Sequence, residues 1–321
     1  MAWPRTSVPD KTRSAAPSPA ASQRAGSPAA NDRAPNDRAR LAVRKTHKLF
    51  IGGAFPRSES GRSFPVHDAS GELLAYAAKA SRKDLRDSVK AARSAFAGWS
   101  GATAYNRGQV LYRVAELMEG RSAQFAAEVA RAEGLRRKQA EALVADAIDR
   151  WVWYAGWSDK VAQVAGAANP VAGPYFNFSV PEPTGVVVVL GPAQSSLLGL
   201  VSVLAPVIVT GNTAVVIASE HCPLPSVALA EVLATSDVPP GVVNVLTGSA
   251  GELAPVAAGH MDVNAIDLTG VAAGERAELE RIAACNLKRV YYDHERWDEP
   301  PGTRRLLAPL EIKTVWHPAG I

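Results

Sequence analysis

The sequence has little cysteine and no long uninterrupted apolar run. Cys222 and Cys285 are the only cysteines among 321 residues, too few for a disulfide framework. The longest apolar stretch, Leu197 to Val209, is too short to cross a bilayer and is interrupted by glycine, serine and proline, so we interpret it as a buried helix. No apolar core of a signal peptide is recognisable. We therefore expect a cytoplasmic protein without a membrane partner.

Motifs for metals, nucleoside triphosphates and nucleic acids are also missing. The six histidines show no metal-ligand spacing with one another, and there is no Walker loop, G-x-S-x-G motif or nucleic-acid motif. The net charge of +4 arises in residues 1–45, which hold nine Lys and Arg against three Asp and Glu and leave −2 for the remainder. We expect neither a metal nor a nucleic-acid partner.

Residues 1–45 are rich in Ala, Pro, Ser, Arg and Asn and have few large apolar side chains. Such a segment cannot bury enough surface to offset the entropy lost on ordering, so we interpret it as a disordered tail. An organelle transit peptide is disfavoured by the acidic residues and prolines. An electrostatic tether for anionic partners is the remaining alternative, and we favour a solvated tail.

The body is apolar enough for a large core, since 47% of the whole chain is hydrophobic. After short strand-like runs from Lys48, the stretch Ser81-Arg-Lys-Asp84 resembles a capping box and predicts a helix to about Trp99. Further helices are predicted over Val110–Met118, Phe125–Ala132 and about Lys138–Val164. We interpret the four aromatic residues between 151 and 157 as packing between helices.

From residue 166 a hairpin-like segment is followed by alternating strands and helices. Strands are predicted at Gly185–Leu190, Thr213–Ile217, Val242–Leu246, Ala265–Leu268 and Leu287–Tyr292. Helices are predicted near Ser196–Val209, Leu224–Ala234, Ala250–His260 and Gly274–Ala284. This alternation predicts an α/β fold with a parallel, doubly wound sheet. Ligands of such sheets bind beyond the carboxyl ends of the strands, so the loops at 191–196, 218–223, 248–251 and 269–274 are expected near one crevice.

Several blocks, in this order, resemble the aldehyde dehydrogenase superfamily: FIGGAF, GWS, YAGWSDK, EPTGVVVVLGP, GNTAVV, PPGVVNVLTG and LTG. They extend over about Lys48 to Val290, so the likeness is more specific than a single glycine-rich motif. The resemblance implies a Rossmann-type parallel sheet preceded by N-terminal helices, a separate domain with the catalytic cysteine, and a small β oligomerisation flap. It also implies thiolate attack on an aldehyde, hydride transfer to nicotinamide, and hydrolysis by a Glu-activated water.

The residues that carry this chemistry in the family are altered here. Where the family has Pro-Trp-Asn after its first Rossmann strand, this chain has Pro192-Ala193-Gln194. Gln194 thus replaces the Asn whose amide stabilises the oxyanion, and its amide sits one methylene further out. A displacement of about 1 Å costs on the order of 10²-fold in rate.

The cofactor-binding positions are degenerate as well. Ile217 replaces the lysine that holds the adenosine ribose, although Glu220 remains. The family's Phe-Thr-Gly-Ser becomes Leu-Thr-Gly-Val at 268–271, which keeps Thr269 and Gly270 and loses the final hydroxyl. Glu220, Thr269 and Gly270 are the remaining candidates for cofactor contact. We expect NAD(P) to bind weakly or not at all.

The general-base Glu of the family aligns with Asp293, which we interpret as a solvated loop acid because the residues after it no longer match. The stretch that holds the family's catalytic cysteine is missing between Asp293 and the C-terminal flap strand. Neither cysteine replaces it. Cys222 stands before a proline at a helix start, where the helix dipole can lower a thiol pKa, but the sequence places no base beside it.

The resemblance therefore implies a truncated, non-catalytic member, similar to the pseudo-domain of long two-part members. Its expected parts are the tail 1–45, N-terminal strands and helices 46–170, a flap hairpin 171–183, a nucleotide-binding-like domain 184–297, and a linker with the last flap strand 298–321. The expected function is to form a homo-oligomer or to assemble with and stabilise a full-length aldehyde dehydrogenase. The alternative is an NAD(P)-dependent oxidoreductase with an altered aldehyde site.

Overall fold

A parallel five-stranded sheet forms the centre of the structure, a computed structural model that describes residues 43–293 and 296–319. The strands lie in the order β10-β9-β6-β7-β8. They are β6 (Val186–Leu190), β7 (Thr213–Ile217), β8 (Val243–Leu246), β9 (Ala265–Asp267) and β10 (Arg289–Tyr291). The predicted Rossmann-type α/β fold is confirmed. Strand order reverses between β6 and β9, which makes this the switch point where such sheets bind ligands.

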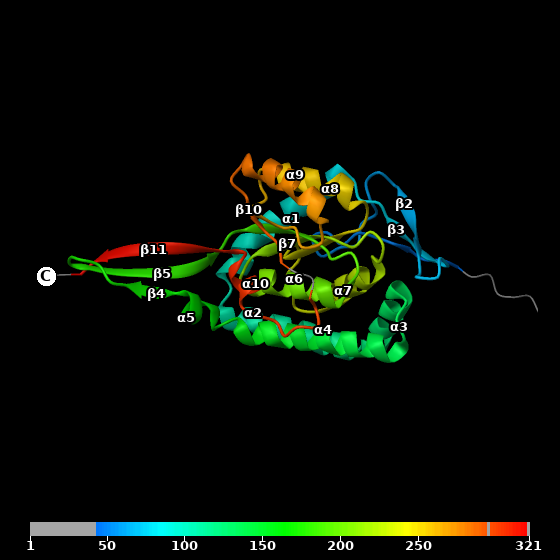
Figure 1. Ribbon diagram of the computed structural model, residues 1–321, viewed down its shortest axis with the longest axis horizontal. Coiled ribbons are helices and arrows are strands. Elements are labelled where there is room, and N and C mark those ends of the chain that lie inside the picture. The colour runs from blue at the N-terminus through cyan, green and yellow to red at the C-terminus, as the bar shows by residue number, and fades with distance from the viewer. Residues whose placement is uncertain (1–42, 294–295, 320–321) are drawn as a thin grey trace, which may run out of the picture. The chain divides into compact units, whose positions relative to one another are not determined.

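Helices cover both faces of the sheet because its central strand is apolar on both sides. Val187 and Val189 of β6 pack on one side, and Val186, Val188 and Leu190 pack on the other. Figure 1 shows α1, α8 and α9 above the sheet, with α6 and α7 below it and α2 and α4 beyond them. The later helices are α6 (Leu198–Val209), α7 (Leu224–Thr235), α8 (Ala250–Gly259) and α9 (Ala273–Ala284).

The N-terminal part consists of a small sheet and four long helices. Its strands, β1 (Thr46–His47), β2 (Ser63–His67) and β3 (Leu73–Ala78), lie in the order β1-β3-β2. The helices are α1 (Arg82–Gly101), α2 (Ala104–Glu119), α3 (Ser122–Glu133) and α4 (Arg137–Trp157). The predicted capping box of α1 is present at Ser81 and Asp84. Residues 1–42 of the predicted tail lie outside the described residues, whereas the carbonyl of Lys45 accepts a 3.0 Å bond from Tyr76 N.

The helix predicted over Lys138–Val164 is interrupted at residues 158–160 and is therefore two helices. Helix α4 ends at Trp157, and the short helix α5 (Val161–Ala165) follows a turn. Lys160 folds back and donates from Nζ to the carbonyl of Gly156 at 2.6 Å, which satisfies one of the carbonyls left open at a helix end. The aromatic residues of α4 do pack in the core, since Trp151 and Tyr154 are fully buried.

Three strands form a third sheet, here called the flap: β4 (Ala167–Asn169), β5 (Tyr175–Pro183) and β11 (Leu310–Pro318). Strand β11 follows the short helix α10 (Arg304–Leu307) and pairs antiparallel with β5, from Leu310 opposite Pro183 to Pro318 opposite Tyr175. The order β11-β5-β4 leaves β11 as an edge strand. Figure 1 shows the flap projecting away from the central sheet.

The flap is joined to the central sheet through one buried side chain. The Asn212 amide oxygen accepts from Gly185 N at 2.9 Å and from the Thr184 hydroxyl at 3.1 Å, next to the end of β5. Its amide nitrogen donates to the carbonyl of Pro309 at 2.9 Å, next to the start of β11. Both flap strands are therefore fixed at the same point of the loop before β7. Within the described residues, no helix combines the length and apolarity needed to cross a membrane.

Candidate functional site

The turn after β6, residues 191–196, lies at the switch point of the sheet. Gly191 N donates to the carbonyl of Ile217 at 2.8 Å and holds the turn beside the end of β7. Gly270, after β9, approaches so closely that a Cβ there would clash with the carbonyl oxygens of Leu190 and Gly191. Its amide donates to Leu190 O at 3.2 Å. Gly270 thus meets a packing requirement of the backbone, and its N–H is directed to the protein.

The predicted oxyanion position and the start of α6 present no free donor pair to a substrate. Gln194 is exposed. Two residues on, Ser196 donates to the carboxylate of Glu133 from its backbone N at 2.8 Å and from its hydroxyl at 2.6 Å. A protein carboxylate therefore occupies the two donors that Ser196 offers just before α6. The sequence analysis did not find Glu133, because nothing in the pattern of α3 marks its last residue as a partner of this turn.

Thr269 is turned away from the crevice. Its hydroxyl donates to the Asp267 carboxylate at 2.5 Å, and its backbone N donates to the same oxygen at 2.8 Å. Both residues are buried. Burial raises the pKa of Asp267, while Arg305 and the bonds from Thr269 oppose that rise. The hydroxyl predicted as a cofactor contact is therefore engaged inside the protein.

Glu220 lies at the other side of the crevice and caps a helix. Its carboxylate accepts a 3.3 Å bond from the backbone N of Ala250, the first residue of α8. A carboxylate at this end of a helix is favoured by the helix dipole. Glu220, Thr269 and Gly270 thus all lie at the carboxyl ends of the strands, as predicted, but each is bonded to protein.

An apolar slot of about 370 Å³ lies between α8 and α9 beside the end of β6. Leu190, Ala254, Val271 and Leu279 contribute to its walls, and Glu275 and Glu278 are its charged lining residues. Its volume is large enough for a flat apolar ring. Glu278 is paired with Arg281 at 2.6 Å, so the slot disfavours a phosphate nearby mainly through the carboxylate of Glu275.

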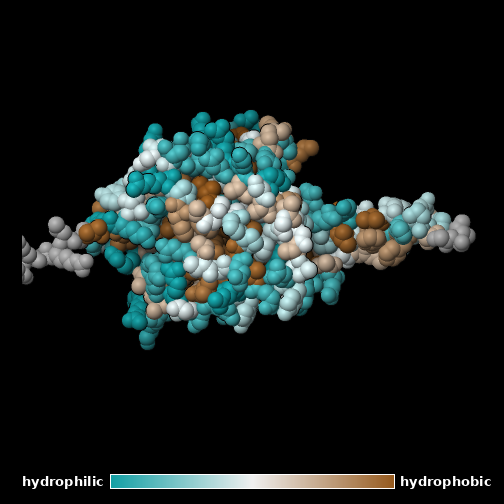
Figure 2. Space-filling view, turned by 180° about the vertical axis from the view of Figure 1, so that it is seen from behind, coloured by the Kyte–Doolittle hydropathy of each residue, from teal (hydrophilic) through white to brown (hydrophobic). Residues whose placement is uncertain are grey.

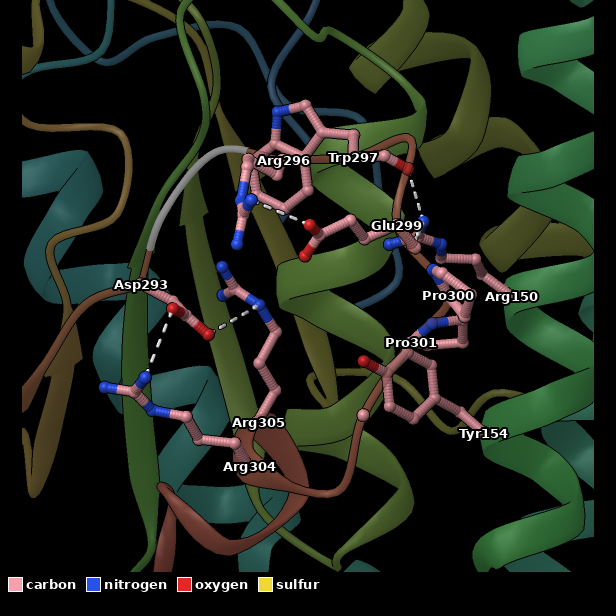
Figure 3. Close-up of a pocket in the computed structure, with 11 residues that line it drawn as sticks. Arg150, Tyr154, Asp293, Arg296, Trp297, Glu299, Pro300, Pro301, Arg304 and Arg305 are labelled. Atoms are coloured by element: carbon pink, nitrogen blue, oxygen red, sulfur yellow. Dashed lines mark hydrogen bonds and ion pairs between the residues drawn. The ribbon is translucent and has the colours of Figure 1, made fainter.

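Asp293 is placed between two arginines of α10. Its carboxylate lies 3.6 Å from Arg304 Nη1 and 3.9 Å from Arg305 Nε, and its side chain is 25% exposed. Figure 3 shows both guanidinium groups directed toward it. The interpretation of Asp293 as a solvated loop acid is wrong, because the segment replacing the family's catalytic part folds back and covers the carboxyl ends of β9 and β10 with cations.

The same segment closes a polar pocket that sequence reasoning missed. Arg150 and Tyr154 reach it from α4, and Trp297, Arg304 and Arg305 reach it from the segment after β10. Arg150 and Tyr154 are four residues apart, on one face of α4. That spacing, with an arginine on an otherwise apolar helix face, was the one sequence signal for this pocket.

The profile of the aldehyde dehydrogenase family matches residues 55–294. The chain belongs to the aldehyde dehydrogenase family. It is 33% identical over 261 residues to retinal dehydrogenase 2 of Gallus gallus, with 80% of this chain and 50% of that protein covered. It is 33% identical over 254 residues to aldehyde dehydrogenase family 2 member B4, mitochondrial, of Arabidopsis thaliana, with 78% and 47% covered.

Several solved structures share the fold. HpcC of Thermus thermophilus superposes with a TM-score of 0.74 at 31% identity, covering 78% of this chain and 48% of that one. Betaine aldehyde dehydrogenase of Staphylococcus aureus, solved with NAD+, superposes with a TM-score of 0.73 at 23% identity, covering 77% and 50%. The chain spans about half the length of the curated relatives it matches. The resemblance to this family is confirmed.

The NAD(P) cofactor that the family implies fits the residues of this chain poorly. The slot accepts a ring, but Thr269 is bonded to Asp267, Glu220 is bonded to Ala250, and two carboxylates line the slot. Opposing a phosphate with carboxylates costs binding energy. No group of three metal-ligating side chains gathers within residues 43–293 and 296–319.

Neither cysteine has the surroundings of a nucleophile. Cys222 Sγ donates to the carbonyl of Ala132 at 3.2 Å, and burial, followed by the charge of Glu133, raises its pKa. Both of these influences oppose formation of the Cys222 thiolate. Cys285 is exposed at the end of α9, where its Sγ contacts the carbonyl of Arg281 at 3.7 Å.

Proposed function

We propose that this chain is a non-catalytic member of the aldehyde dehydrogenase family that assembles with and stabilises a full-length aldehyde dehydrogenase through its flap. The altered residues at the family's catalytic positions support the proposal that the chain is non-catalytic. Gln194 stands at the oxyanion position, Asp293 is held by two arginines, and the Cys222 thiol has a raised pKa. Together these residues provide no activated nucleophile and no free base for thioester hydrolysis.

The single observation that carries the proposed assembly with a full-length enzyme is the retained flap. Strand β11 pairs with β5 along nine residues although the segment before it has lost the catalytic part. Ile312 is 56% exposed and Trp316 is 59% exposed on one face of β11, and Tyr175 packs against Trp316 at 5.8 Å between ring centroids. Figure 2 shows apolar side chains gathered on the projecting flap. An exposed apolar edge strand is suited to pairing with another chain.

The test is to purify the tagged chain from its native cells and to measure the mass of the intact complex by native mass spectrometry. We expect a full-length aldehyde dehydrogenase in fixed ratio. The double variant Ile312→Glu, Trp316→Glu should lose it, because two charges replace the apolar face. Met261→Glu is the matched control, since Met261 is a 78% exposed apolar residue outside the flap. A homo-oligomer alone, or retention of the partner by the double variant, would contradict the assembly.

An altered NAD(P)-dependent oxidoreductase is the second candidate, and the apolar slot of about 370 Å³ favours it. Titration of the isolated chain with NAD+ and NADH, followed by an assay with short and long aldehydes, separates the two. Weak or no binding and no turnover are expected of the non-catalytic chain. Tight binding together with aldehyde turnover would establish the oxidoreductase instead.

A further inference from the structure

A cavity of about 290 Å³ lies between α4, α10 and the linker, defined here as residues 296–303. Of the family positions considered above, Asp293 lines it, and binding of a ligand here does not rest on flap assembly. Its volume is near the lower end of the range for ligand pockets, about 300–1,000 Å³, and suits a small molecule rather than a dinucleotide. The lining residues are Arg150, Tyr154, Asp293, Arg296, Trp297, Glu299, Pro300, Pro301, Gly302, Arg304 and Arg305.

Cations outnumber anions around this cavity. Four guanidinium groups line it, against the carboxylates of Asp293 and Glu299. Glu299 is paired with Arg296 at 2.9 Å. Arg150 is 8% exposed and donates to uncharged acceptors, the Ser202 hydroxyl at 2.8 Å and the carbonyl of Glu299 at 2.7 Å among them. A buried arginine bonded to uncharged groups leaves a positive field in the cavity.

The ion pairs of Arg305 are long and shared. Its Nη1 lies 3.7 Å from Asp267, and its Nε lies 3.9 Å from Asp293. Its guanidinium also stacks over Trp297, 5.1 Å from the ring centroid. These distances exceed those of a tight charge-assisted bond, about 2.7–2.9 Å, so neither carboxylate uses the full donor capacity of Arg305.

Two buried donors at the cavity are left without an acceptor among the described residues. They are Nη2 of Arg305 and the hydroxyl of Tyr154. Tyr154 is fully buried, and Figure 3 shows its hydroxyl directed toward Arg305 and the linker. Burial raises the pKa of Tyr154 to about 12, so the hydroxyl keeps its proton at neutral pH and acts as a donor. Buried donors of this kind are normally paired.

We propose that this cavity binds a small molecule through its oxyanion group, a carboxylate or a phosphate, held by Arg305 Nη2 and the Tyr154 hydroxyl. An oxyanion accepts several hydrogen bonds and donates none, so it satisfies both donors at once. The rim is open to solvent on the linker side, since the side chains of Arg296 and Arg304 are 67% and 77% exposed. These two arginines draw an anion toward the buried pair.

Thermal unfolding of the full chain, in the presence of inorganic phosphate or succinate at constant ionic strength, tests the site. We expect a saturable rise of the unfolding midpoint with at least one of them, because a ligand that binds the folded state stabilises it. A rise with phosphate alone would indicate that the natural ligand is a phosphate ester, and a rise with succinate alone would indicate a carboxylic acid. A rise with both anions would indicate a site that binds either oxyanion. No saturable rise with either anion would overturn the proposal.

Two variants make the test specific. Tyr154→Phe keeps the ring and removes one donor, and we expect the dissociation constant of the effective anion to rise about tenfold or more. Arg304→Gln removes a rim charge from an exposed position and should also weaken binding. Arg137→Gln is the matched control, because Arg137 is 86% exposed on α4 and lies outside the cavity lining. Unchanged binding in both variants, or an equal loss in the control, would show that the stabilisation is non-specific.

Discussion

The carboxylate of Glu133, the last residue of α3, accepts both hydrogen bonds that Ser196 offers at the start of α6, at 2.8 Å from the backbone N and 2.6 Å from the hydroxyl. The turn 191–196 therefore keeps the shape expected at the end of a first Rossmann strand while its donors are used by the protein itself. The same carboxylate acts on the thiol of Cys222 and helps to raise its pKa. The carboxylate of Glu133 thus fixes the turn. Its negative charge disfavours both a thiolate at Cys222 and a bound anion at the donors of Ser196.

We predict that Glu133→Ala lowers the free energy of unfolding by about 1–2 kcal/mol, because Ser196 loses the acceptor for its backbone N at a helix start. Glu133→Gln should recover part of this loss, since its amide oxygen still accepts. Urea unfolding followed by circular dichroism measures both. Glu141→Ala serves as control, because Glu141 forms an exposed pair with Arg137 and its loss should cost little. Equal effects at the two positions would contradict this role of Glu133.

The two thiols should react at different rates. Cys285 is exposed, whereas Cys222 is half-buried and has a raised pKa, so less of it is thiolate at neutral pH. We expect a disulfide reagent to label Cys285 first and Cys222 slower by on the order of tenfold or more. Cys285→Ser should leave only the slow phase and Cys222→Ser only the fast one. A fast phase that disappears in Cys222→Ser would indicate an activated thiol and revive a nucleophilic role.

The central sheet was predictable because its signals are local. Val186–Leu190 and Thr213–Ile217 are continuous apolar runs, and each of the two is buried in full. The capping box at Ser81 is equally local. The long helix predicted through Val164 failed because a lysine side chain closes α4 at Gly156, and this tertiary choice is not visible in the apolar spacing.

The site was less predictable because its contacts join distant parts of the chain. One cluster joins three elements: Asp267 on β9, Asp293 after β10 and Arg305 on α10. These side chains come together because α10 packs over the carboxyl ends of β9 and β10. Sequence spacing therefore suggested a solvated acid at Asp293. The candidate positions Glu220, Thr269 and Gly270 follow the ends of strands, but the resemblance held no information on the segment after β10.

Lys288 predicts a pH dependence of stability. Its Nζ donates to the carbonyls of His260 at 2.7 Å and Val263 at 3.0 Å, and burial lowers its pKa to about 8 from an ordinary value of 10.5. Between these two pH values the folded chain binds fewer protons than the unfolded chain. Stability contributed by this group therefore rises with pH across that window and is flat below it.

The measurement is the difference in unfolding free energy between the parent chain and Lys288→Met at several pH values from neutral to about 10. Taking the difference removes the titration of all other groups that the variant leaves unchanged. The unfolding free energy of the parent chain should rise relative to that of the variant as the pH increases above 8. The variant also leaves the carbonyls of His260 and Val263 without this donor, which adds a difference that does not depend on pH. A difference that is constant with pH would contradict the lowered pKa.

Asn212 is the last residue for which the structure gives a sharp expectation, because one buried amide holds both long flap strands at their roots. Replacing it by Ala leaves Gly185 N without its acceptor and removes one of three donors to the carbonyl of Pro309, which keeps the backbone N and hydroxyl of Thr184, and we expect a loss of about 2 kcal/mol. Amide exchange should accelerate along β11 more than along β6, since β11 depends on this anchor and β6 is paired on both sides. Hydrogen exchange read by mass spectrometry distinguishes the two strands. Asn106→Ala, at an exposed position of α2, is the control, and uniform acceleration in Asn212→Ala would mean that the amide stabilises the whole fold and not the flap in particular.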